Sequence, residues 1–117
     1  MTNKVAIFIY ESLAGDMSHA YRGLKTALEF VQAGDEVAVV FDGSGVETLA
    51  AITDSGSKLN GILQEIKSSV DGACSFCASS HKVTEAITAA GYSLLTDFQG
   101  EASVRKYVND GYTMLSF

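Results

Sequence analysis

The stretch VAVVFDGSGV, residues 37–46, joins a continuous apolar run to a polar, glycine-rich turn. Its first half, Val37–Phe41, has the length and composition of a strand that is buried on both faces. Ser44 and Glu47 then have capping-box spacing, which predicts that a helix begins here and runs through Leu49, Ala50 and Ile52. The stretch therefore predicts one strand–turn–helix unit.

The same alternation continues on both sides of this unit. Upstream, Lys4–Tyr10 is rich in Val, Ile, Phe and Tyr and predicts a buried strand. Apolar residues then recur at helical spacing from Ala20 to Val31, and Ser18 is the predicted N-cap of that helix. Downstream, the polar residues 54–58 interrupt the pattern before a second helical series runs from Leu59 to Val70.

The second half of the chain is expected to contain three further strands and two further helices. The predicted strands are Ala73–Phe76, Tyr92–Thr96 and Tyr112–Phe117. Ser79 or Ser80 is the expected cap of a helix that carries Val83, Ala86, Ile87 and Ala90, and Val104, Tyr107 and Val108 indicate the last helix.

Four glycines, at positions 34, 72, 91 and 111, stand between a predicted helix and the next predicted strand. Glycine ends helices readily because it adopts the left-handed conformation at little cost. Repeated helix–Gly–strand junctions favour an α/β fold with a single open, mostly parallel five-stranded sheet. Helices are expected on both faces, with flavodoxin-like layering, and residues 1–117 are expected to form one domain.

Composition limits the classes of function. The chain has 117 residues and a formal net charge of -6, with 47% hydrophobic and 19% charged residues. An acidic surface without a Lys/Arg cluster repels phosphate, so we expect no nucleic-acid partner and no binding to anionic membranes. The apolar run Val5–Tyr10 is too short for a membrane span or signal peptide, so a cytoplasmic protein is expected.

Ligands of open parallel sheets bind beyond the carboxyl ends of the strands. In this chain the rule selects four groups of residues: Glu11, Ser12, Asp16 and His19; Asp42, Gly43, Ser44 and Gly45; Cys74, Cys77 and His81; and Asp97, Phe98 and Gln99. Both cysteines and both histidines fall in this set, which makes the cysteine segment the candidate site.

Cys74 and Cys77 have the Cys-x-x-Cys spacing that lets two sulfurs meet. Cys77 is predicted at a strand end just before a helix, where amides and the helix dipole would lower its pKa. This pattern predicts a reactive thiol with an assisting partner. The alternative is a pair of inert residues packed beside Phe76. His81 could lower the thiol pKa, or could simply be a solvated residue in the first turn of the helix.

Two other uses of these residues receive less weight. Cys74, Cys77, His81 and His19 could supply four zinc ligands, but one Cys-x-x-Cys is half a motif, and we predict neither a metal nor a cofactor. The turn Asp42–Gly45 could cradle phosphate on helix amides, although Asp42 would repel that anion, so a simple turn is favoured. The loop carboxylates Glu11, Asp16, Asp42 and Asp97 are interpreted as solvated.

With these elements placed, the chain resembles the DsrE/DsrF-like superfamily, which includes the YchN-like proteins. The residues that carry the resemblance are Val5-Ala6-Ile7-Phe8-Ile9-Tyr10, the stretch 37–46, Gly72-Ala73-Cys74-Ser75-Phe76-Cys77-Ala78 and the C-terminal segment 110–117. Only the cysteine segment is chemically specific. The segment 78–83 lacks the Arg-Gly pair that relatives often carry there.

The resemblance implies a five-stranded parallel sheet and a homo-oligomer, often a trimer or hexamer. It also implies that a cysteine after the third strand carries a persulfide in sulfur relay. Counting back from Val83 favours Cys74 for this position, whereas the predicted strand boundary favours Cys77. At most, the protein would then be a sulfur carrier of the sulfurtransferase type, with sulfur donor and acceptor proteins as partners.

Other Cys-x-x-Cys and doubly wound proteins fit less well. Thioredoxin-like folds place a cis-proline against the motif, and this chain has no proline. The acidic loop 11–16 does not suit a flavodoxin, and the third strand lacks the aspartate of a receiver domain. Two hypotheses remain: a persulfide carrier or thiol-redox protein that acts through Cys74 and Cys77, and a non-catalytic oligomeric binding or scaffold protein with inert cysteines.

Overall fold

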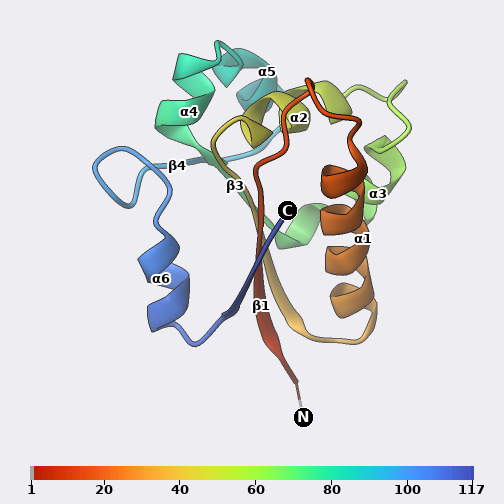
Figure 1. The fold of residues 1–117 in the computed structure, drawn as a ribbon, viewed down its shortest axis with the longest axis vertical. Coiled ribbons are helices and arrows are strands. Elements are labelled where there is room, and N and C mark those ends of the chain that lie inside the picture. The colour runs from red at the N-terminus through yellow and green to blue at the C-terminus, as the bar shows by residue number, and fades with distance from the viewer. Residues whose placement is uncertain (1) are drawn as a thin grey trace.

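A computed structural model describes residues 2–117, and its centre is a five-stranded sheet with the order β4-β3-β2-β1-β5 (Figure 1). Every pairing between these strands is parallel. The strands are β1 Lys4–Ile9, β2 Glu36–Phe41, β3 Val70–Cys74, β4 Leu94–Leu95 and β5 Thr113–Ser116. The predicted α/β class and parallel sheet are confirmed.

The helices cover the two faces of this sheet very unequally. They are α1 Ser18–Gln32, α2 Gly45–Ile52, α3 Asn60–Glu65, the 3-10 turn η1 Lys67–Ser69, α4 Ser75–Ser80, α5 Thr84–Ala89 and α6 Val104–Asn109. From β1 to β4 the chain moves across the sheet in one direction, and right-handed crossovers therefore put α1 to α5 on one face. The step from β4 back to β5 reverses direction, so among the helices of residues 2–117 only α6 covers the other face.

Alternate residues of the central strands point to these two layers. Val5, Ile7 and Ile9 of β1 join the large cluster that packs against α1 to α5. Ala6 and Phe8 join a small cluster on the other face, where Tyr107 of α6 covers them. Both faces of β1 and β2 are thus buried, as the continuous apolar runs predict.

The predicted boundaries of the third strand are wrong. The strand begins at Val70, which was expected to end a helix, and it stops at Cys74, so Ser75 and Phe76 are already helical. Gly72 consequently lies inside β3 instead of ending a helix, whereas the other three junction glycines stand where predicted with positive φ. Gly72 is required because an added Cβ would collide with the carbonyl oxygen of Ser93.

The predicted helix caps also differ from the structure. Ser18 is the first residue of α1, and it is Asp16 whose carboxylate accepts a hydrogen bond from the Ser18 amide, at 2.9 Å. Ser44 precedes α2, but its side chain makes no capping hydrogen bond. Ser79 and Ser80 belong to α4, and the next helix begins after Val83. Short polar side chains thus have several local hydrogen-bond options that spacing alone does not separate.

Within residues 2–117, no helix combines the length and the hydrophobicity that crossing a bilayer requires.

Candidate functional site

Strand register determines which residues meet at the carboxyl edge of the sheet. Ile9 pairs with Phe41, and Phe41 pairs with Ala73, so β1, β2 and β3 end side by side. The residues that follow Phe41 and Ala73 are Asp42 and Cys74, and they therefore lie close together at this edge.

The two cysteines occupy different environments. Cys74 ends β3, precedes the first residue of α4 and is fully buried. Cys77 is the third residue of α4, one turn further on, and is partly exposed. Both are free thiols. Cys77 is consequently the sulfur that a reagent or partner can reach, and Cys74 lies behind it.

Asp42 completes a compact group with the two thiols. Its Oδ1 accepts a hydrogen bond from the Gly43 amide at 2.8 Å and one from the Cys77 thiol at 3.6 Å. The donor atoms of Asp42, Cys74 and Cys77 all lie within 4.8 Å of one another. Three groups that can each lose a proton thus converge at one point, and we call them the dithiol–carboxylate cluster.

The electrostatics of this cluster keep Cys77 protonated. Burial raises the pKa of the Cys77 thiol to about 12, and the adjacent Cys74 thiol and the Asp42 carboxylate act in the same direction. The Gly43 amide offsets these effects only in part. The prediction that the start of a helix lowers this pKa is therefore wrong, because desolvation and two acidic neighbours outweigh the amides.

His81 and Glu47 form a separate contact beside the cluster. His81 follows the last residue of α4, and its Nδ1 lies 2.9 Å from Oε2 of Glu47 in α2. Glu47 therefore does not form the expected capping box with Ser44. The pair joins α4 to α2, and the Cys77 sulfur contacts Asp42 instead of His81.

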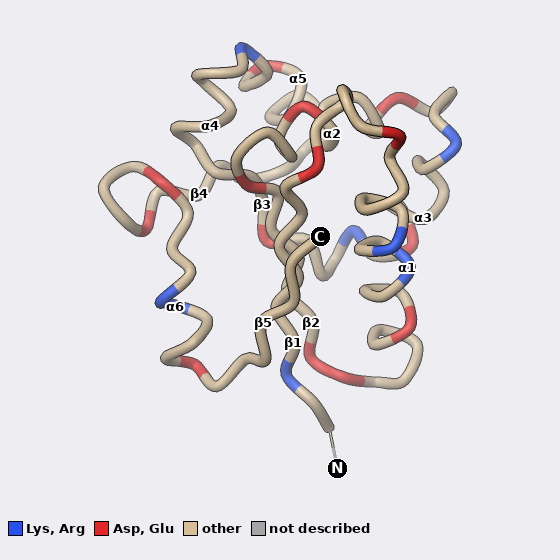
Figure 2. The backbone as a smooth tube through the Cα atoms, viewed as in Figure 1, with Lys and Arg blue, Asp and Glu red and all other residues tan. Residues whose placement is uncertain are grey.

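Tyr10 and a concentration of acidic groups surround the cluster. The Tyr10 ring lies 3.4 Å from where a Cβ of Gly43 would be, and burial, Asp42 and Cys77 raise the pKa of its hydroxyl. Figure 2 shows acidic positions gathered around α2 and the carboxyl ends of the strands, with Lys and Arg mostly at the periphery. The edge is therefore polar and acidic, and the Tyr10 ring lies beside Gly43.

The remaining strand-end residues do not join the cluster. Glu11 accepts a hydrogen bond from the Ala20 amide at 2.9 Å, and Asp16 accepts one from Ser18. Asp97 lies 3.6 Å from the Lys106 ammonium group. His19 is exposed on α1, and within residues 2–117 neither histidine belongs to a group with metal-ligand geometry. These carboxylates thus have local partners, and the imagined four-ligand zinc site is not assembled.

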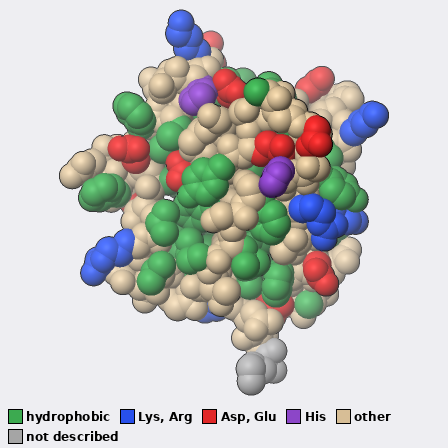
Figure 3. Space-filling model, viewed as in Figure 1, with side chains coloured by type: hydrophobic (Ala, Val, Ile, Leu, Met, Phe, Trp, Pro, Cys, Tyr) green, Lys and Arg blue, Asp and Glu red, His purple; other side chains and the backbone are tan. Residues whose placement is uncertain are grey.

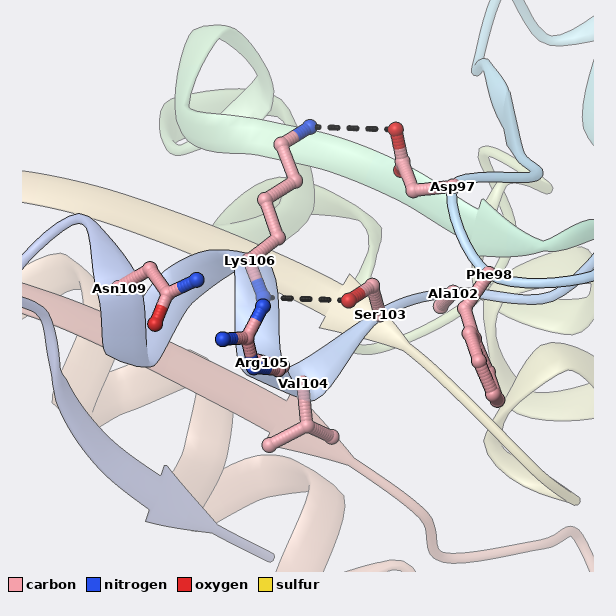
Figure 4. Close-up of a pocket in the computed structure, with 8 residues that line it drawn as sticks. All are labelled: Asp97, Phe98, Ala102, Ser103, Val104, Arg105, Lys106 and Asn109. Carbon is pink, nitrogen blue, oxygen red and sulfur yellow. Dashed lines mark hydrogen bonds and ion pairs between the residues drawn. The ribbon is translucent and has the colours of Figure 1, made fainter.

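A pocket of about 750 Å³ lies elsewhere, beside the start of α6 (Figure 4). The residues that line it are Asp97, Phe98, Ala102, Ser103, Val104, Arg105, Lys106 and Asn109. Lys106 reaches Asp97 across its rim, and the Ser103 hydroxyl accepts the hydrogen bond that caps α6. The pocket holds neither cysteine, so its size alone does not make it the reactive site.

Sequence reasoning missed the contact between Asp42 and Cys77. It placed both residues at strand ends, but it assigned them to separate groups. The order of the β-α units could have indicated this contact. Consecutive units place neighbouring strands side by side, so the residues that follow two such strands lie close together at the edge of the sheet.

Known proteins share this fold at low sequence identity. No family model matches the chain, and no curated protein matches it. The conserved protein of unknown function BT1422 from Bacteroides thetaiotaomicron is similar in structure, with a TM-score of 0.68, 17% identity, and coverage of 96% of this chain and 94% of that chain. The ychN protein from E. coli gives a TM-score of 0.62 at 14% identity, covering 99% of this chain and 100% of that chain.

Fold and site together define a small α/β protein with paired thiols at the carboxyl edge of a parallel sheet. Its fold is YchN-like, as the resemblance in the sequence implies.

Proposed function

We propose that this protein is a persulfide carrier or thiol-redox protein that works through Cys77, with Cys74 as the second thiol. The observation that supports the proposal best is the pairing of one reachable sulfur with one buried sulfur at the ligand-binding edge of the sheet. A buried thiol cannot meet a donor protein, but it can attack its neighbour. The proposal assumes a reducing compartment such as the cytoplasm, where cysteines of this kind stay free.

The chemistry follows from thiol–disulfide exchange. The Cys77 sulfur attacks the outer sulfur of a donor persulfide, forming a Cys77 persulfide and releasing the donor as its thiol. A partner thiol can then take the outer sulfur. Alternatively, Cys74 attacks the inner Cys77 sulfur, which forms the Cys74–Cys77 disulfide and releases hydrogen sulfide. The protein would act as a sulfur carrier more than as an enzyme that turns over a substrate.

Asp42 and His81 have distinct parts in this proposal. Because the Cys77 thiol donates to Asp42, the carboxylate orients the sulfur at the edge of the sheet. Its negative charge also helps to keep the thiol protonated, so little thiolate is present at neutral pH and attack follows removal of the proton by the donor or by solvent. His81 acts as a positioning residue that holds α4 against α2 through Glu47.

The test is intact-protein mass spectrometry after treatment of the reduced protein with polysulfide. Wild-type protein should gain about 32 Da in a form that dithiothreitol removes. Cys74→Ser should accumulate more of this adduct, because its resolving thiol is gone, and Cys77→Ser should form none. A folded wild-type protein that gains no mass would refute the proposal.

A second candidate function is an oligomeric binding protein with unreactive cysteines. Two observations favour it: the raised pKa of Cys77, and hydrophobic side chains gathered on the face that α6 covers (Figure 3). We define the α6-side patch as the exposed residues Tyr10, Phe98, Val104 and Val108. We propose that a homo-oligomer, a trimer or hexamer, buries this patch in either case.

A further inference from the structure

We propose that the dithiol–carboxylate cluster of Asp42, Cys74 and Cys77 binds a thiophilic cation of the Zn²⁺ type, with a fourth position open to solvent. The proposal does not rest on the sulfur-carrier function, because it needs only the three side chains. The ligand set differs from the two cysteines and two histidines considered from the sequence. The fold brings Asp42 together with the two cysteines, and it brings neither histidine into the cluster.

The geometry of the donors fits a zinc site. Zinc binds thiolate at about 2.3 Å and carboxylate at about 2.0–2.2 Å, so a tetrahedral ion holds such donors roughly 3.5 Å apart. The Cys77 sulfur and Oδ1 of Asp42 are 3.6 Å apart, and the Cys74 sulfur lies within 4.8 Å of both donor atoms. Small rotations of the side chains would therefore suffice to bind the ion.

The chemistry of the donors selects the kind of ion. Two thiolates favour zinc or copper(I) over magnesium and calcium, which prefer oxygen ligands. A carboxylate as third ligand favours zinc over copper(I), which prefers soft donors only. Three protein ligands and one open position are the arrangement found in zinc sites that exchange a ligand.

The surroundings supply orientation, access and charge. The Gly43 amide fixes Asp42 by bonding Oδ1, which is the kind of support that metal-ligating carboxylates receive. Cys77 and Asp42 are both partly exposed, so an ion can enter from solvent. Within residues 2–117, Asp42 forms no ion pair with Lys or Arg, so no side-chain cation neutralises the cluster.

Binding can be written as a balanced exchange. The aqueous ion replaces the protons of the Cys74 and Cys77 thiols, both protons pass to the buffer, and the Asp42 carboxylate coordinates in its ionised form. No oxidant or reductant takes part. The bound ion would occupy the sulfurs that accept sulfane sulfur, so metal binding and persulfide formation are expected to exclude one another.

The experiment titrates fully reduced protein with Co²⁺ and then Zn²⁺, without any sulfur donor. Co²⁺ should produce a thiolate-to-metal charge-transfer band in the near ultraviolet, and Zn²⁺ should abolish it with release of the bound Co²⁺. Competition with a chromophoric chelator then gives the Zn²⁺ affinity. Circular dichroism of each variant confirms that it is folded.

Cys77→Ser should abolish the charge-transfer band, and Asp42→Asn should weaken Zn²⁺ binding roughly 10- to 100-fold. Asp54→Asn, which changes an exposed carboxylate outside the cluster, serves as the matched control and should bind as wild type does. Cys74 is fully buried, so Cys74→Ser is the variant most sensitive to misfolding. If it fails to fold, the variants of Cys77 and Asp42 still test the proposal.

Absence of the band in wild-type protein would overturn the proposal, as would a Zn²⁺ affinity that Cys77→Ser and Asp42→Asn leave unchanged. Sulfur loading is measured separately, in the presence of a chelator, so failure of the metal site and failure of the carrier function give different results.

Discussion

The reactivity of Cys77 depends on two opposing features of its surroundings. The sulfur is accessible, but burial and acidic neighbours keep it protonated at neutral pH. A sulfur that is exposed but protonated is typical of a thiol that reacts only when a partner or an ion displaces its proton. It does not suit a thiolate that reacts with any electrophile in solution.

Cys77 is expected to react with iodoacetamide roughly 10- to 100-fold more slowly at pH 7 than a free cysteine, because its small thiolate fraction is offset only partly by greater nucleophilicity. The rate should keep rising with pH through pH 9 and beyond, since the pKa is raised. Asp42→Asn should accelerate the reaction by removing a nearby negative charge. Stopped samples analysed by mass spectrometry give these rates, and a plateau below pH 8 would contradict the raised pKa.

At the scale of elements, the site depends on how closely α2 approaches β1. Gly45 begins α2, and a Cβ at this position would overlap the carbonyl oxygen of Ile9. This contact fixes the turn Asp42–Ser44 and therefore the carboxylate that meets Cys77. The glycine is required by space, since no positive φ is involved.

Gly45→Ala should consequently destabilise the protein by about 1–3 kcal/mol, as expected when a packed contact must move apart. Gly61→Ala is the matched control, because nothing lies within 4 Å of a Cβ at that helical position. Alanine there should leave stability unchanged or raise it by up to about 1 kcal/mol. Urea denaturation of both variants measures the difference, and equal midpoints would show that α2 can shift freely.

Elements also show where prediction from sequence succeeds and fails. The apolar runs that became β1 and β2 were predictable because strands buried on both faces need no alternation. The β3 boundary was not, because Val70 continues a helical spacing in the sequence although it pairs with Val39 of β2 in the structure. Because of this wrong boundary, the sequence predicts Cys77 at a strand end instead of inside α4. It also predicts a lowered pKa for the Cys77 thiol, which the structure does not support.

The whole molecule carries several buried or hydrogen-bonded acids that the fold keeps protonated. Burial and a hydrogen bond to Asp71 raise the pKa of Tyr107. The Tyr112 hydroxyl donates to Glu36, which raises its pKa to about 12, and the Cys77 pKa is also about 12. Each of these groups loses its proton more readily in the unfolded chain than in the folded one.

The contribution of these groups to stability should therefore be constant below about pH 8 and fall as pH rises from about 9 towards 12. Over this range the unfolded chain binds fewer protons than the folded protein, so the free energy of unfolding has a negative slope with pH. Tyr107→Phe should reduce the slope because it removes one of the groups. Urea unfolding between pH 7 and pH 10.5 tests this, and stability that rises with pH would contradict it.

The unequal covering of the sheet leads to a prediction about assembly. Sedimentation velocity should detect an oligomer of wild-type protein, because the α6-side patch is apolar and exposed. Val108→Lys should shift the protein towards monomer. Tyr21→Lys, on α1 on the opposite face, is the matched control and should not. A wild-type protein that stays monomeric at all concentrations would exclude this interface.

The location of added sulfur in wild-type protein shows directly whether Cys77 is the accepting thiol. The protein is treated with limiting polysulfide, alkylated at once, digested and mapped by tandem mass spectrometry, with Cys77→Ser in parallel. We expect the alkylated persulfide on Cys77 and none on Cys74. A persulfide on Cys74, or no persulfide on either cysteine of the folded protein, would contradict it.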